Sequence, residues 1–372
     1  LSGQLIINGS GAIVKVIFTK LYNITFSQSG LPTGTNWSVS LYNYTNKLLY
    51  SIGIKYNSVN SVLAYDTQNG LIYVADWNNS YVWIINPSSQ TVLGAIYIGS
   101  NTTSVTYDPA NGNLYVTDYA NTVTVINGIS NSIITTINVG GDPFYSIYDP
   151  LNKNIYVADL GSANLTVING TTNKVTGDIS VGLGPISIAL DTENGYLYVP
   201  NQFSNNVSVV NPSTEKSIAS INVGSYPAFA LYDSGDNLIY VTNSNSNNIS
   251  VINPATEKVI RTIPLQNYSY PWGMVYDPSN NFIYVANINS VSMINPSTGT
   301  ILQVINVYNY PNYFLYDPAN SLIYVSGSEN VSVIFYMQNT YLTKYSTGTS
   351  ISFNQPSGYY SFNVSQIKGY RA

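Results

Sequence analysis

The chain has 372 residues and a net charge of −5, and Lys and Arg together contribute only 12 of them. So few basic residues argue against a nucleic-acid partner, because counterion release from phosphates needs a positive stripe. The sequence contains no Cys and no His, which removes disulfides, thiolate chemistry and the commonest general base. We therefore expect a non-enzymatic protein without cofactor or metal. No apolar run approaches the ~20 residues of a membrane span.

Residues 1–45 predict short β-strands. Alternating apolar residues flank Asn8-Gly9-Ser10-Gly11, a turn sequence that predicts a hairpin within residues 1–20. Residues 22–26 and 37–39 continue the alternation. We interpret residues 1–45 as the N-terminal part of a small β-sandwich.

Seven copies of a segment with a period near forty residues occupy residues 46–337. The second predicted strand of each copy contains Tyr-Val and follows a turn with Asp. These turn residues are Asp66, Asp108, Asp149, Asp191, Asp233, Asp277 and Asp317. Such a period is typical of a β-propeller, in which every repeat forms one four-stranded blade. The sequence therefore predicts an all-β protein with seven blades.

The second copy illustrates one blade. Strands are predicted at 104–107, 114–117, 122–126 and 132–139, where apolar and polar residues alternate. Asp108-Pro109 and Asn127-Gly128 provide turns, since Pro presets φ and Asn and Gly tolerate positive φ.

The seventh copy lacks its fourth strand. Residues 46–52 fit the register of the fourth strand at 257–263, so we predict that residues 46–54 close the last blade. Closure would remove both free sheet edges of the ring.

The repeat resembles the Tyr-Val-Thr-Asn (YVTN) β-propeller family of archaeal surface-layer-like proteins. Tyr115-Val116-Thr117-Asp118 and Tyr240-Val241-Thr242-Asn243 carry the resemblance, with the strands 124–127 and 250–253 that follow them. The resemblance implies a seven-bladed propeller on a cell surface and no fixed reaction. Residues 22–39 are similar to an immunoglobulin-like module of archaeal envelope proteins.

Residues 338–372 contain further short alternating strands at 350–353 and 358–364. We predict that they complete the sandwich begun by residues 1–45, so that the propeller is inserted in, or attached to, a sandwich formed from both chain ends. Strands of residues 1–20 can complete their own sandwich or that of a neighbouring subunit, which would produce a filament.

A polar residue follows the second strand in six copies, and aromatic residues lie near it in the sequence. In a propeller these positions gather at one mouth of the channel, where aromatic faces and amides can bind a sugar or a peptide. Phe144, Tyr145 and Phe203 belong to the same predicted mouth. The candidate ligand-binding residues are Asp76, Trp77, Asp118, Tyr119, Asp159, Asn201, Asn243, Trp272 and Asn287. Alternatively, the Asp and Asn residues cap strands and bond to their own loops.

Asn-x-Ser/Thr triplets are frequent and favour a secreted, glycosylated surface, although an Asn-rich and Ser-rich sequence also produces them by chance. The acceptors are Asn8, Asn23, Asn36, Asn43, Asn78, Asn101, Asn164, Asn169, Asn206, Asn248, Asn267, Asn330 and Asn363. Three functions remain open. An extracellular envelope or filament subunit that binds copies of itself or other envelope proteins is favoured, a module that binds surface glycans or proteins is the alternative, and a polysaccharide-cleaving enzyme is disfavoured.

Overall fold

A computed structural model describes residues 13–18, 22–27, 37–54, 61–77, 79–266, 269–307, 310–328, 330–346, 350–355 and 358–366. The chain divides into two compact units, one of residues 48–335 and one of residues 1–47 with 336–372. Within the described ranges no helix is long and apolar enough to cross a membrane.

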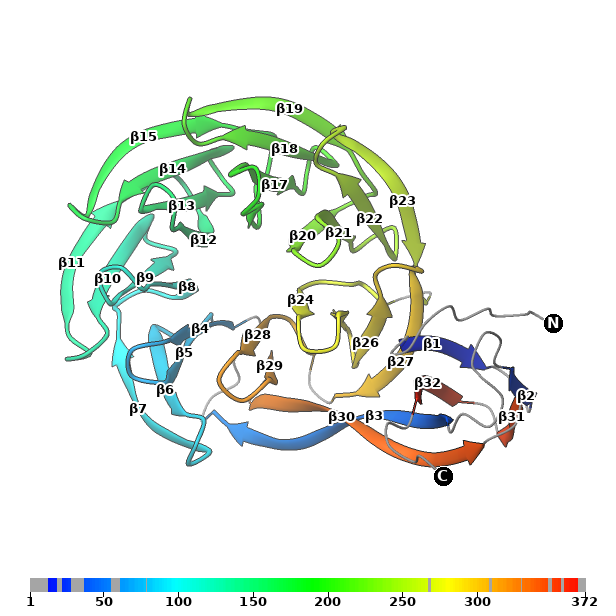
Figure 1. The fold of residues 1–372 in the computed structure, drawn as a ribbon. Coiled ribbons are helices and arrows are strands. Elements are labelled where there is room, and N and C mark those ends of the chain that lie inside the picture. The colour runs from blue at the N-terminus through cyan, green and yellow to red at the C-terminus, as the bar shows by residue number, and fades with distance from the viewer. Residues whose placement is uncertain are drawn as a thin grey trace. The chain divides into compact units, whose positions relative to one another are not determined.

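Residues 48–335 form a seven-bladed β-propeller of four-stranded antiparallel sheets around one axis, which confirms the predicted all-β class and blade number (Figure 1). Blade one contains β4 (Val62–Asp66), β5 (Leu71–Asp76), β6 (Tyr81–Asn86) and β7 (Thr91–Tyr97). Blade two contains β8 (Thr102–Asp108), β9 (Asn113–Asp118), β10 (Thr122–Asn127) and β11 (Ile133–Asn138). Blade three contains β12 (Pro143–Asp149), β13 (Asn154–Asp159), β14 (Asn164–Asn169) and β15 (Lys174–Ser180).

The next three blades repeat this order, with the first strand nearest the axis (Figure 1). Blade four contains β16 (Ala189–Leu190), β17 (Leu197–Asn201), β18 (Asn206–Asn211) and β19 (Lys216–Asn222). Blade five contains β20 (Pro227–Asp233), β21 (Leu238–Asn243), β22 (Asn248–Asn253) and β23 (Lys258–Pro264). Blade six contains β24 (Met274–Asp277), β25 (Phe282–Asn287), β26 (Ser290–Asn295) and β27 (Thr300–Asn306).

The last blade takes its strands from two parts of the chain. It contains β28 (Phe314–Asp317), β29 (Leu322–Gly327), the first part of β30 (Asn330–Ser346) and the last part of β3 (Trp37–Gly53). Ser51 Oγ lies 3.1 Å from Ser332 Oγ, and the side chains of Ile52 and Ile54 are buried in the core. The N-terminal strand therefore occupies the outermost place of this blade.

The seven turn Asp residues adopt one geometry, which confirms their prediction as turn formers. In every blade the carboxylate Oδ1 accepts the backbone N–H two residues later, at 2.8–2.9 Å, as in Asp108 with Ala110 and Asp277 with Ser279. This bond folds the chain between the first and second strands.

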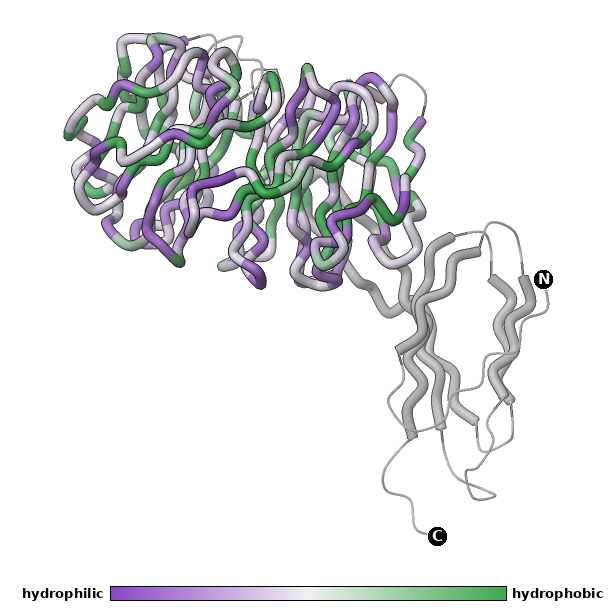
Figure 2. Tube along the Cα trace, turned by 90° about the horizontal axis from the view of Figure 1, so that it is seen from above, coloured by the Kyte–Doolittle hydropathy of each residue, from purple (hydrophilic) through white to green (hydrophobic). Residues whose placement is uncertain are grey.

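The Tyr of each Tyr-Val pair is buried, and in blades one, two and five its hydroxyl bonds to the next blade. Tyr73 donates from its hydroxyl to the carbonyl of Gly128, and Tyr115 donates in the same way to Gly170. Each of these hydroxyls also accepts from an Asn four residues earlier, Asn69 or Asn111. Since a buried hydroxyl needs a partner, these Tyr residues hold neighbouring blades together where the bonds occur. Figure 2 shows hydrophobic segments interspersed with hydrophilic ones along the strands.

The other unit brings strands of both chain ends together. β1 (Ile13–Phe18) and β3 each pair with β32 (Gly358–Gln366), whereas β2 (Tyr22–Ser27) pairs with β31 (Ser350–Gln355). β1 and β32 belong to the same chain, so their pairing agrees with the alternative in which residues 1–20 complete the sandwich of their own molecule. Packing of these strands as a sandwich, and strand exchange between subunits, stay predictions.

Candidate binding face of the propeller

The polar residues predicted to follow the second strands are the last residues of those strands, and they are buried and bonded within their own blades. Asp159 Oδ2 accepts from the backbone N–H and the hydroxyl of Thr166, at 3.1 and 2.6 Å. Asn243 Nδ2 donates to Ser250 Oγ at 3.0 Å, and Asn201 donates to a Ser in the same way. All six predicted polar residues are buried, namely Asp76, Asp118, Asp159, Asn201, Asn243 and Asn287. These contacts fit the strand-capping alternative, and ligand binding by these six residues stays a prediction.

A glycine of the preceding loop packs directly on three of these side chains. A Cβ added to Gly140, Gly182 or Gly224 would lie 2.5–2.6 Å from atoms of Asp159, Asn201 or Asn243. Such a distance is far below van der Waals contact. In blades three, four and five this Gly therefore allows the loop backbone to cover the capping residue.

Replacing Gly182 with Ala is expected to destabilise the fold by about 1–3 kcal/mol, since either the loop or Asn201 must move. Gly94 in β7 is the matched control, because a Cβ added there meets nothing within 4 Å. Thermal or urea unfolding should show a lower unfolding midpoint for Gly182→Ala and an unchanged or higher midpoint for Gly94→Ala. Equal midpoints for the two variants would contradict the close packing.

Burial also changes the acidity of the capping carboxylates. Loss of hydration raises the pKa of Asp159 to about 7, and the nearby charge of Asp178 acts in the same direction. Burial likewise raises the pKa of Asp118. No group of three or more Asp, Glu, His or Cys residues capable of holding a metal occurs in the part of the chain that the structure describes.

Three predicted aromatic residues form one partly exposed cluster, in which Tyr119 is exposed and Trp77 and Phe144 are half-buried. The indole N–H of Trp77 donates to the hydroxyl of Tyr119 at 2.8 Å, and the two rings are stacked with centroids 6.2 Å apart. The ring of Phe144 meets Trp77 edge-on, also at 6.2 Å. Because these residues come from blades one to three, the aromatic cluster breaks the sevenfold symmetry.

Other aromatic residues of the predicted mouth lie elsewhere. Trp272 packs against the hydrophobic core, and Phe203 packs on the backbone of Gly184. Tyr145 contacts Phe229 and Tyr313, with ring centroids 5.9 and 6.3 Å apart.

Tyr145, Phe229 and Tyr313 come from blades three, five and seven and meet across the axis. The ring centroids of Phe229 and Tyr313 are 6.0 Å apart, so each of the three rings contacts the other two. The corresponding positions of the other blades hold Val62, Ser104, Ser187 and Gly273. Large residues alternate with smaller ones, so that three rings fill the axis between them. Tyr145 was predicted to lie at the mouth, whereas Phe229 and Tyr313 were not among the predicted residues.

No protein family and no curated protein matches the sequence. Among solved structures, the chain is similar to a chain of hydrazine synthase from Kuenenia stuttgartiensis, with a TM-score of 0.67 and 16% sequence identity. The match covers 76% of this chain and 96% of that chain. At this level of identity the likeness shows the propeller fold alone.

Proposed function

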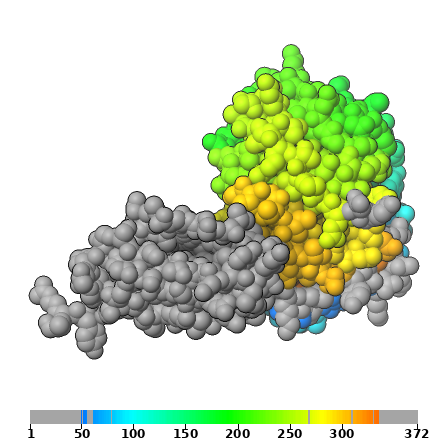
Figure 3. All heavy atoms as spheres, turned by 90° about the vertical axis from the view of Figure 1, so that its right-hand side faces the viewer, coloured from blue at the N-terminus to red at the C-terminus, as the bar shows by residue number. Residues whose placement is uncertain are grey.

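We propose that the chain is a non-enzymatic structural protein of a cell surface, in which propellers pack side by side through the rims of their rings. The observation that carries the proposal is a set of exposed apolar side chains on the outermost strands. Figure 3 faces this rim, where the yellow-green to gold residues of blades five and six lie side by side.

A β-bulge lies at the same place in the outermost strand of each of the first six blades. In four blades the bulged residue is apolar and exposed. These rim residues are Leu93 (56% exposed), Ile134 (48%), Ile218 (45%) and Ile260 (54%). Bulges interrupt the hydrogen-bond ladder and discourage the addition of a further strand. The rim therefore favours contacts between side chains, which suit an ordered layer.

Other features support a surface location. The composition is poor in charge, and the seven repeats support a place in the YVTN family of archaeal surface-layer-like proteins. Among the acceptor Asn residues with described side chains, Asn101 is exposed and available to an extracellular glycan. The partly buried ones are Asn164, Asn169, Asn206, Asn248 and Asn330. The ones outside the described side chains are Asn8, Asn23, Asn36, Asn43, Asn78, Asn267 and Asn363.

The absence of an enzymatic role is supported by how the carboxylates are used. The seven turn Asp residues bond to their own loops, and the capping Asp residues bond to their own blades. A general acid and base pair instead needs carboxylates that face a common cavity.

Replacing the four rim residues together by Ser is expected to raise the concentration needed for assembly by about tenfold or more, because apolar burial drives association. Sedimentation velocity over a range of concentrations, with electron microscopy of the same samples, measures this. The matched control replaces Ile129, Leu151 and Leu183, exposed apolar residues of turns and loops, by Ser. If the rim variant assembles like the control and the wild type, the rim is not the contact.

The aromatic cluster favours carbohydrate binding as a second function. Tyr119 is exposed, Trp77 and Phe144 are half-buried beside it, and together their rings and the phenol hydroxyl form a combination that packs on the C–H face of a sugar and bonds to its hydroxyls. A surface protein with both features would pack into a layer and hold glycans.

A further inference from the structure

Blade six differs from its neighbours at two loops on one face of the ring. The loop between β25 and β26 consists of residues 288–289, whereas the corresponding loops of blades three and five span 160–163 and 244–247. The loop that leads into blade six is longer, running over 265–273 compared with 223–226 before blade five.

A substitution accompanies the change in length. The second residue after the outermost strand is Gly140, Gly182 and Gly224 before blades three, four and five, and Gln266 before blade six. Those glycines lie against the capping residue with no room for a Cβ. The backbone at Gln266 must therefore lie farther from its capping residue, Asn287.

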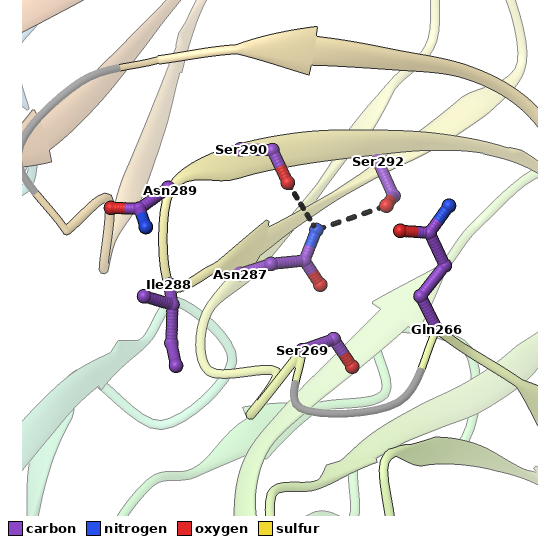
Figure 4. Close-up of a pocket in the computed structure, with 7 residues that line it drawn as sticks. All are labelled: Gln266, Ser269, Asn287, Ile288, Asn289, Ser290 and Ser292. Carbon is purple, nitrogen blue, oxygen red and sulfur yellow. Dashed lines mark hydrogen bonds between the residues drawn. The ribbon is translucent and has the colours of Figure 1, made fainter.

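The space that results is a cavity of about 320 Å³, which we name the blade-six pocket (Figure 4). Its volume is at the lower end of the ~300–1,000 Å³ that is usual for ligand sites, so it has room for one small ring. The lining residues are Gln266, Ser269, Asn287, Ile288, Asn289, Ser290 and Ser292.

The lining is neutral and rich in hydrogen-bonding groups. Asn287 is only 6% exposed, and its Nδ2 donates to Ser292 Oγ at 2.9 Å. Its Oδ1 has no hydrogen-bond partner among the described residues, and Figure 4 shows it on the side facing Ser269 and Gln266. Since an unpaired buried acceptor is costly, a ligand hydroxyl that reached it would be stabilised.

Hydrogen bonds at Ile288 and Tyr270 link described residues of the pocket to each other and to blade five. The backbone N–H of Ile288 donates to the carbonyl of Ser269 at 3.1 Å, which ties the two loops together. The next residue, Tyr270, has a φ of 41° and donates its N–H to Asn247 Oδ1 at 3.0 Å. Groups that such bonds already hold lose less entropy when a ligand binds.

We propose that the blade-six pocket binds a single neutral sugar residue. Amides and hydroxyls both donate and accept, as sugar hydroxyls require, and no charged side chain lines the pocket to favour an acidic or basic ligand. That the ligand is a carbohydrate rests on the carbohydrate-binding function proposed above. The proposal assigns that ligand to a site separate from the aromatic cluster.

The test uses methyl glycosides of glucose, mannose and galactose as probes, with glucuronic acid as a charged comparison. Saturation-transfer NMR and titration calorimetry on the full chain should show binding of at least one neutral glycoside and weaker binding of glucuronic acid. Replacing Gln266 by Ala should weaken that binding about 3- to 10-fold, and Gln266→Ala with Ser269→Ala should weaken it further. Asn245→Ala is the control, since Asn245 is an exposed amide of the blade-five loop between β21 and β22 and does not line the pocket.

A Trp77→Ala variant separates the two sites. If Trp77→Ala abolishes binding while both pocket variants bind like the wild type, carbohydrate binding stands and the pocket assignment is wrong. If no neutral glycoside binds at millimolar concentration, both the pocket and the carbohydrate-binding function are overturned.

Discussion

Replacing Ile52 with Asp is expected to destabilise the propeller by more than about 4 kcal/mol. The side chain is buried in the outermost strand of blade seven, where an unpaired charge has no compensating partner. The substitution also weakens the strand that closes the ring, so both neighbouring sheet edges would be exposed. We expect loss of the cooperative thermal transition, or a large fall in its midpoint, measured by circular dichroism.

Two matched variants make this result interpretable. Ile263 occupies the equivalent position of blade five and is also buried, so Ile263→Asp should be equally damaging. Leu49 lies on the same strand as Ile52 but is exposed, and Leu49→Asp should have little effect. A melting curve for Ile52→Asp that matches Leu49→Asp would show that this strand does not close the blade.

The propeller is expected to be most stable in acid. The pKa of Asp159 is raised to about 7 and that of Asp233 to about 6, mainly by burial, from an ordinary value of 3.8. A group whose folded pKa is raised binds its proton more tightly in the folded state. Its favourable contribution is complete below the unfolded pKa and is lost as pH rises through the folded pKa, here between about pH 4 and 7.

Replacing Asp159 with Asn should remove much of this pH dependence. The repeat already uses Asn at this position in blades four and five, where it bonds to a Ser of its own blade. One pKa unit corresponds to about 1.4 kcal/mol, so the free energy of unfolding of the variant at pH 8 should exceed that of the wild type by up to about 4 kcal/mol. At pH 4 the two proteins should have nearly equal stability. Asp142 lies in an exposed loop, so the control variant Asp142→Asn should show the same pH dependence of stability as the wild type. A wild-type midpoint that is constant or rises from pH 4 to 8 would contradict the burial of an ionised Asp159.

Repetition explains what could be predicted from the sequence. The turn Asp residues occur in seven copies, and each makes a bond two residues along its own chain, so local chemistry alone identifies them. The strands of blade two lie within one or two residues of their predicted bounds for the same reason. The linking role of Tyr73 and Tyr115 was not foreseen, because their partners belong to the next blade.

The candidate sites arise from exceptions to the repeat. Trp77 and Tyr119 were identified because both follow a second strand, yet their contact with Phe144 depends on the arrangement of three blades. The three rings at the axis come from alternate blades, so no local pattern connects them. The blade-six pocket had one sequence signal, the replacement of a recurring Gly by Gln266. That signal acquires meaning only when the close packing of the glycines is known.

Packing through the rim is tested most directly by chemical cross-linking of an equal mixture of unlabelled and ¹⁵N-labelled protein at a concentration where it assembles. Lys174, Lys216 and Lys258 begin the outermost strands β15, β19 and β23. We predict cross-linked peptide pairs in which one peptide is unlabelled and the other is ¹⁵N-labelled, with the link between two of these three lysines. The variant with Ser at the four rim residues should not give these intermolecular cross-links. Links between labels that involve only Lys15, Lys20, Lys344 and Lys368, near the chain ends in sequence, would contradict rim packing.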